Sequence, residues 1–182
     1  MKTIIRKLFY NYEKEEKWLN EMSAKGFALT DYTWCRYVFT DCQPGEYIYR
    51  LELLEHSPTH AVSQKYIQFM EENGVEHISS YIRWVFFRKK AADGAFDIYS
   101  DADSKIKHYR MVIKLFTSIA IAAFGACVYN IYVSFLIAQR GIYPFNFVVG
   151  AIVGFLGVYM MFVGRSFHRK IKKLKKDKEI ME

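Results

Sequence analysis

Two long apolar runs near the end of the chain dominate its hydrophobic pattern. Residues 115–139 and residues 141–164 contain no charged side chain, and Arg140 is the one charge between them. About 20 apolar residues in a helix cross the hydrocarbon core of a bilayer, so each run is long enough to span it. We therefore predict a transmembrane hairpin of two spans, with a tight turn helped by Gly141 and Pro144.

Two shorter helices are predicted within residues 1–100. Trp18, Leu19 and Met22 form an apolar stripe with helical spacing, and Gly26 follows where a helix would end. A second helix is expected to end at Gly74 in the same way.

Extended segments surround these two helices. They are rich in aromatic and β-branched residues, or alternate between apolar and polar side chains, and they cover residues 3–10, 27–41, 47–55 and 75–89. A turn at Asp93-Gly94 predicts a further short strand at residues 96–99.

The two helical segments belong to a weak internal repeat. Aligning Gly26 with Gly74 also aligns Met22 with Met70, and each half then has the order strand, helix, glycine, strand. Two such halves predict a βαββαβ arrangement, the ferredoxin-like sandwich. We therefore expect residues 1–100 to form an α+β domain.

The domain connects to the first span through residues 101–114. This stretch has no helix-breaking residue, so we expect one helix from about residue 101 to about residue 138. Such a connection suits both a rigid coupling to the bilayer and a plain anchor.

Charge is distributed unevenly along the chain. The net charge is +7, yet residues 1–110 hold 16 Lys and Arg against 16 Asp and Glu, which argues against nucleic-acid binding. Basic residues flank both spans and continue through the tail, residues 165–182, whereas the turn between the spans carries Arg140 alone. The positive-inside rule therefore predicts a cell-membrane protein with both termini in the cytoplasm. The tail is either an orientation signal or a contact to anionic membrane lipids.

Small residues recur within the two spans. They let helices approach closely, so we expect these faces to pack on each other. Asn130, the one strongly polar residue at depth, is expected to form a hydrogen bond across the hairpin. The expected packing residues are Ser118, Ala122, Ala126 and Asn130 in the first span and Gly150, Gly154 and Gly157 in the second.

No motif of catalysis or metal binding is complete. His56 and His60 are interrupted by a proline, and Asp101 and Asp103 lie where a helix needs a cap. The three cysteines lack metal-site or disulfide spacing. We expect no metal site, no cofactor and no enzymatic activity.

One open sheet face is the candidate binding site. Because successive side chains of a strand point to opposite faces, seven aromatic and charged side chains would share this face. Such a set suits a planar or anionic ligand. The alternatives are a solvated charge ladder and a dimer interface. The residues are Tyr32, Trp34, Arg36, Arg50, Glu52, Tyr81 and Arg83.

Several local motifs resemble one uncharacterised family of small bacterial membrane proteins. They are Trp18-Leu19-Asn20-Glu21-Met22 with Gly26, Pro44-Gly45-Glu46-Tyr47 with Tyr49-Arg50, Trp84, Phe87-Arg88-Lys89, and Ile98-Tyr99-Ser100-Asp101 with Ser104-Lys105. The resemblance implies a domain of unknown function on the cytoplasmic side of a membrane anchor, often encoded beside a PadR-type transcriptional regulator. It implies no activity.

These observations leave two leading hypotheses. In the first, the chain is a membrane-anchored cytosolic binding or regulatory module with a small-molecule ligand or a protein partner, including a second copy of itself. In the second, it is an accessory subunit that packs through its hairpin within a larger membrane complex, such as a transporter. An enzyme that uses the Arg/Glu/Tyr face is a third and weaker alternative.

Overall fold

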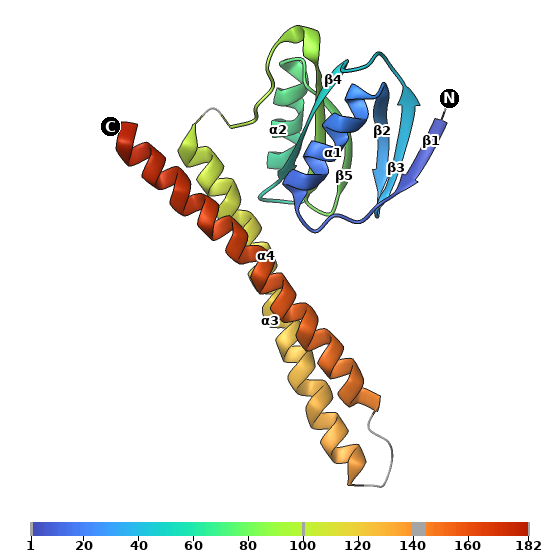
Figure 1. Ribbon diagram of the computed structural model, residues 1–182, viewed down its shortest axis with the longest axis vertical. Coiled ribbons are helices and arrows are strands. Elements are labelled where there is room, and N and C mark those ends of the chain that lie inside the picture. The colour runs from blue at the N-terminus through green and yellow to red at the C-terminus, as the bar shows by residue number, and fades with distance from the viewer. Residues whose placement is uncertain (1, 100, 140–144, 182) are drawn as a thin grey trace. The chain divides into compact units, whose positions relative to one another are not determined.

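The computed structural model describes residues 2–99, 101–139 and 145–181. Contacts divide the chain into two units, residues 1–100 and residues 101–182 (Figure 1). The predicted tight turn at Arg140, Gly141 and Pro144 lies outside the described residues.

The first unit consists of two halves with the same order of elements. The first half contains β1 (Lys2–Arg6), α1 (Tyr12–Ala24), β2 (Phe27–Thr33) and β3 (Arg36–Asp41). The second contains β4 (Tyr47–Leu53), α2 (Ala61–Glu72), β5 (Glu76–Tyr81) and β6 (Trp84–Lys90). Each half forms its own antiparallel sheet, in the orders β1-β3-β2 and β4-β6-β5.

The α+β class is confirmed, but the ferredoxin-like detail is not. A βαββαβ sandwich has four strands, whereas the described residues here form two sheets of three strands each. The difference arises at residues 27–41 and 75–89, each of which folds back on itself as a hairpin. The unit that is repeated is therefore βαββ.

The repeat extends to the details of these two hairpins. The pairs that close the turns are 33/36 in the first hairpin and 81/84 in the second, which are 48 residues apart. The register shifts at 29/31 in one hairpin and at 77/79 in the other, again 48 residues apart. The two halves are thus structural copies.

Neither hairpin turn has the residues that usually signal one. Two-residue hairpin turns favour Asn or Gly because the backbone adopts positive φ there. Here the positive φ values belong to Trp34 (35°), Cys35 (57°) and Ile82 (58°). The two turns consequently read as uninterrupted strand in the sequence.

The short strand predicted at residues 96–99 is also absent. Ala91–Asp93 form a 3-10 helix, η1, and residues 94–99 after it belong to no helix or strand. Phe96 is 6% exposed and packs into a hydrophobic cluster. Burial of this ring on the α2 side takes the place of strand pairing.

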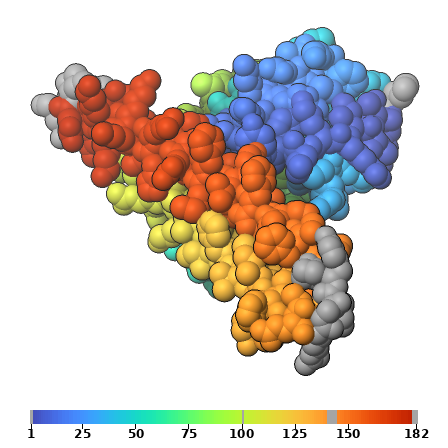
Figure 2. Space-filling model, turned by 60° about the horizontal axis from the view of Figure 1, so that its bottom comes forward, coloured from blue at the N-terminus to red at the C-terminus, as the bar shows by residue number. Residues whose placement is uncertain are grey.

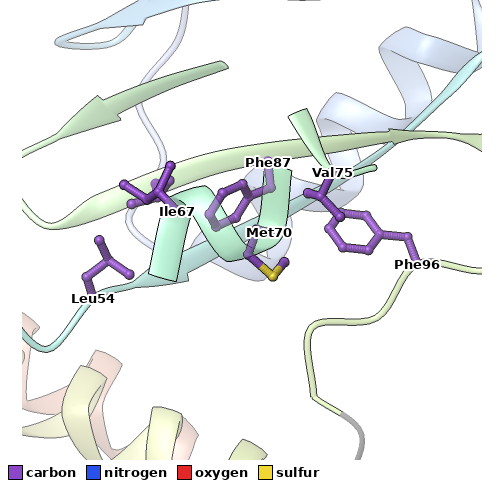
Figure 3. Close-up of a cluster of buried hydrophobic side chains, with 7 residues drawn as sticks. Leu54, Ile67, Met70, Val75, Phe87 and Phe96 are labelled. Carbon is purple, nitrogen blue, oxygen red and sulfur yellow. The ribbon is translucent and has the colours of Figure 1, made fainter. Parts of the chain in front are cut away.

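That cluster holds α2 against the second sheet (Figure 3). Full burial of a large apolar side chain stabilises a fold by about 1.5–3 kcal/mol relative to exposure. The cluster consists of Leu54, Ile67, Met70, Val75, Val85, Phe87 and Phe96.

Polar side chains of α1 cover the free edge of β4. Asn20 accepts a hydrogen bond from the Tyr49 N–H (2.9 Å) and donates one to the Tyr49 carbonyl (3.1 Å). Glu16 accepts from the Leu51 N–H at 3.0 Å, and Ser23 donates to the Tyr47 carbonyl at 2.7 Å. An uncovered edge strand invites pairing with other chains, and α1 blocks that pairing here.

The second unit is a pair of long helices packed side by side. They are α3 (Ala102–Ala138) and α4 (Phe145–Met181), each 37 residues long (Figures 1 and 2). Asp101 caps α3 by accepting a hydrogen bond from the Ser104 N–H at 2.7 Å. The helix expected from about residue 101 to about residue 138 is therefore present. The basic residues that follow the second apolar run lie in the same helix, α4.

Both helices are long and apolar enough to cross a membrane. Large apolar side chains face outward along them, among them Ile121 (67% exposed), Val128 (67%) and Phe155 (75%). Outward apolar faces of this length are typical of helices whose solvent is lipid.

Candidate functional site

The seven residues expected on one open sheet face fall into two groups. Five of them lie in or beside the two hairpin turns, whereas Arg50 and Glu52 lie within β4. The predicted alternation of faces does not continue through residues 27–41, because the turn at Trp34-Cys35 divides this segment into two strands. The five residues at the hairpin turns are Tyr32, Trp34, Arg36, Tyr81 and Arg83.

The structure brings the aromatic members of the first group together. The Tyr81 ring lies 6.0 Å from the Tyr32 ring and 6.0 Å from the Trp34 ring, measured between centroids. The Ser79 hydroxyl donates to the Tyr32 carbonyl at 2.9 Å, which joins the first hairpin to the second. Tyr32 is half-buried against Phe86, whereas Trp34 is 71% exposed.

The two arginines of this group have contacts within the protein. Arg36 forms an ion pair with Asp31 at 3.4 Å. Arg83 donates from Nε to the Leu54 carbonyl at 2.7 Å, and the Leu54 N–H donates back to the Arg83 carbonyl at 2.8 Å. Arg83 thereby fastens the end of β4 to the β5–β6 turn.

Arg50 and Glu52 are on a covered face of β4. Arg50 pairs with Glu16 of α1 at 3.5 Å. Glu52 accepts a hydrogen bond from the Tyr66 hydroxyl of α2 at 2.7 Å, and burial raises the pKa of its carboxyl. Since α1 and α2 contribute these partners, Arg50 and Glu52 do not belong to the group of residues at the hairpin turns.

A buried carboxyl that the sequence analysis missed lies in the first half. Glu15 is 8% exposed, and the Tyr37 hydroxyl donates to it at 2.6 Å. Burial raises the pKa of Glu15 to about 7, while the hydrogen bond from Tyr37 opposes that shift. The signal was available, because Tyr12, Glu15, Leu19 and Met22 all lie on the buried side of α1.

This pair distinguishes the two halves. At the equivalent positions 48 residues later, the chain has Ser63 and Val85. A carboxyl with a pKa near neutrality exchanges its proton under physiological conditions, as a proton-responsive group must. Within the described residues, no cluster of three or more His, Cys, Asp or Glu side chains is arranged to hold a metal ion.

Arg88 of β6 is a second residue that the pattern did not reveal. It donates from Nη1 to the Leu29 carbonyl of β2 at 3.0 Å and from Nη2 to Glu76 at 2.6 Å. Its guanidinium also lies 4.2 Å from the centre of the Tyr47 ring. Arg88 therefore connects the two sheets, a structural role.

The three glycines predicted for helix packing lie against α3. A Cβ at Gly150 would be 3.1 Å from the Asn130 Cβ, and one at Gly154 would be 2.9 Å from the Cys127 Sγ. A Cβ at Gly157 would be 3.3 Å from the Ala123 Cβ. These glycines permit the close approach of the two helices.

The face expected on α3 is shifted from the one observed. Ser118, Ala122 and Ala126 are exposed instead of facing α4. Asn130 borders α4, but its amide donates to the Ala126 carbonyl of its own helix at 2.8 Å. Spacing by four residues identified a stripe of small side chains without showing which side of the helix meets α4.

The helix pair also has a surface hollow of about 320 Å³. Apolar side chains such as Ile113, Phe124 and Met160 line it, and Arg165 and His168 lie at one end.

Fold and site together define a class of protein: an α+β unit made of two βαββ copies, followed in the chain by two long apolar helices. The family model described as "Protein of unknown function (DUF2812)" matches residues 11–121, more than half of the chain, and the chain belongs to that family. Comparisons with curated proteins and with solved structures give no match. The expected family is thus confirmed, while its bacterial occurrence and a neighbouring PadR-type regulator stay predictions.

Proposed function

We propose that the chain is a membrane-anchored binding or regulatory module, with residues 1–100 held at the cytoplasmic face by α3 and α4. The observation that carries this proposal is that the helix pair has an outward apolar surface while the α+β part of the chain forms a unit of its own. Basic residues lie near the N-terminal end of α3 and near the C-terminal end of α4, and they support cytoplasmic termini.

The anchor and its orientation are tested by cysteine labelling. The native cysteines are replaced by serine, and single cysteines are introduced by Lys17→Cys, Lys172→Cys and Arg140→Cys. Lys17 suits this purpose because its side chain is 80% exposed. A maleimide that cannot cross membranes should label position 140 in intact cells, and positions 17 and 172 only in inside-out vesicles. Labelling of position 17 in intact cells would contradict the proposal.

The binding role is tested by native mass spectrometry of the full chain extracted gently from its own membrane. A retained small molecule or protein partner supports the module, and its mass identifies the class. Retention of lipid alone by the wild-type protein would contradict a ligand-binding or partner-binding role.

One observation favours the second candidate, an accessory subunit of a larger membrane complex. Ser118, Ala122 and Ala126 form an exposed stripe on α3, and a Cβ added at Gly125 beside it would meet no atom within 4 Å. Stripes of small side chains are typical of helix–helix contacts in membranes. Ala122→Leu with Ala126→Leu should then reduce the size of the complex, whereas Val128→Leu, outside the stripe, should not.

A further inference from the structure

The most exposed large apolar side chains of the first unit gather at one end of it. Among its described residues, Leu8 (77% exposed), Trp34 (71%) and Ile82 (69%) have the highest exposures of this kind. Leu8 follows β1, Trp34 lies in the β2–β3 turn and Ile82 in the β5–β6 turn. We call these three residues, with Arg6, Lys7 and Arg83, the tip surface.

Several contacts show that these three chain segments are neighbours. The Lys7 N–H donates to the Cys35 carbonyl at 2.9 Å, which places the end of β1 beside the β2–β3 turn. The Trp34 ring lies 6.0 Å from the Tyr81 ring, and Ile82 follows Tyr81 in the chain. In Figure 1 both turns and the end of β1 lie at the lower end of this unit.

The exposed apolar side chains are held there at a conformational cost. Ile82 has φ = 58° and Trp34 has φ = 35°. Positive φ is rare for large residues, and for a β-branched residue it is strained. Asparagine or glycine would relieve this strain in either turn, so folding alone does not account for tryptophan and isoleucine at these positions.

Basic side chains accompany the apolar ones. Arg6 and Lys7 are exposed, and Arg83 follows Ile82 directly. Of the acidic residues nearby, Asp31 is paired with Arg36 at 3.4 Å, and Glu55 follows Leu54, to which Arg83 is hydrogen-bonded. Apolar side chains that project from turns amid basic ones match the interface of an anionic bilayer, where tryptophan is favoured and lysine and arginine meet negative headgroups.

The chain keeps this unit within reach of a bilayer. The first unit is described as far as Tyr99, and α3 begins at Ala102. From there to the first uncharged residue of the apolar run, Leu115, the helix rises by about 20 Å. A compact domain of 100 residues is itself roughly 34 Å across, so tethering raises the effective concentration of headgroups at its surface.

We propose that the tip surface docks on the anionic leaflet of the membrane that holds α3 and α4, with Trp34 and Ile82 at headgroup depth. The proposal rests on the membrane anchoring described under the proposed function. Docking gives the α+β unit a defined contact with lipid that depends on headgroup charge.

Quenching of tryptophan fluorescence by brominated lipid tests this contact in the full chain. The protein is placed in nanodiscs of brominated phosphatidylcholine, either alone or mixed with phosphatidylglycerol. The Trp34→Phe variant supplies the background from the other tryptophans. We expect Trp34 to be quenched in the anionic discs, and the quenching to be lost in neutral discs and in high salt.

Two pairs of variants separate docking from folding. Ile82→Asn should weaken the quenching of Trp34 while raising the midpoint of thermal unfolding, because asparagine accepts positive φ. Val62→Asn, at a 60% exposed position on α2, should leave the quenching unchanged. Arg6→Gln with Lys7→Gln should also reduce quenching, whereas Lys17→Gln should not.

The possible failures are distinguishable. A protein that does not enter nanodiscs at all overturns the membrane anchor and hence the proposed function. A protein that enters the discs without Trp34 quenching overturns the docking alone. Equal quenching in neutral and anionic discs overturns the role of charge. A blue shift of Trp34 emission without quenching, seen only with two copies per disc, identifies a second copy as the occupant instead.

Discussion

Glu15 is the residue whose environment departs most from that of an ordinary surface carboxyl. It lies on the buried side of α1, with the Tyr37 hydroxyl at 2.6 Å and Trp18 packed 4.9 Å from the Tyr37 ring. Burial disfavours the charged form, which is why the pKa of this carboxyl rises to about 7. The protonation of Glu15 is therefore linked to the stability of the fold.

The sign of this linkage gives the first prediction. Between about pH 4.5 and about pH 7 the native protein keeps a proton on Glu15 that the unfolded chain releases. The contribution of Glu15 to the free energy of unfolding of the first unit should therefore fall as the pH rises through this range, by on the order of 3 kcal/mol, and then level off. Thermal unfolding of the full chain in detergent, followed at both ends of the range, measures the fall.

Glu15→Gln is the matched control for this pH dependence. Its amide oxygen still accepts from Tyr37, but the side chain does not titrate. Most of the slope contributed by Glu15 should disappear. What remains includes Glu52, whose pKa is also raised by burial, and His108 of the second unit, whose pKa burial lowers to about 4 and which therefore acts in the opposite direction. An unchanged slope in the variant would show that Glu15 is not the responsible group.

At the scale of elements, the contact of α1 with β4 joins the two halves. Asn20 satisfies both the N–H and the carbonyl of Tyr49 on an edge strand. Asn20→Ala leaves the Tyr49 N–H without this partner and its carbonyl with the Arg50 guanidinium alone. The free energy of unfolding should fall by about 2 kcal/mol, although alanine favours the helix. Hydrogen exchange at the Tyr49 amide should accelerate.

Lys17→Ala is the control for the Asn20 substitution. Lys17 lies on the same helix with its side chain 80% exposed, so its removal should change stability by no more than about 0.5 kcal/mol. Equal effects of the two substitutions would refute a specific role for the contact with β4.

The packing of α3 on α4 gives a prediction that uses two glycines. A Cβ at Gly150 would be 3.1 Å from the Asn130 Cβ and 3.3 Å from the Cys127 carbonyl, whereas one at Gly125 would meet nothing within 4 Å. Gly150→Leu should therefore separate the helices and lower their thermal stability in detergent. Gly125→Leu should not, and a comparable loss in both variants would contradict the observed helix face.

At the scale of the whole molecule, the two units should unfold separately. Each has its own contacts: the first unit has the cluster around Phe87 and Phe96, and the second has the packing of α3 on α4. Calorimetry of the full chain in detergent should show two transitions. Glu15→Gln should alter only the one assigned to the first unit, and a single transition that shifts as a whole would contradict this independence.

Prediction from the sequence succeeded where a pattern depends on local chemistry. The two apolar runs, the helix from about residue 101 and the glycine ends of α1 and α2 all follow from composition and helical period. The repeat was detectable from Gly26 and Gly74 because each ends its helix with positive φ.

The candidate site was harder to predict, because it depends on register. At Trp34-Cys35 and at Ile82 the backbone turns with residues that do not usually occur in such turns, so strand parity assigned Tyr32, Trp34 and Arg36 to one face. In a strand, an error of one residue moves every following side chain to the opposite face.

The sequence by itself determined the class of the chain: an α+β domain followed by two helices able to cross a membrane. These features follow from how apolar and polar residues alternate along short segments. Only the tertiary structure decided that Glu15 is buried beside Tyr37, that α1 covers the edge of β4, and that Leu8, Trp34 and Ile82 lie at one end. Each of these depends on contacts between segments far apart in the chain, which local patterns do not encode.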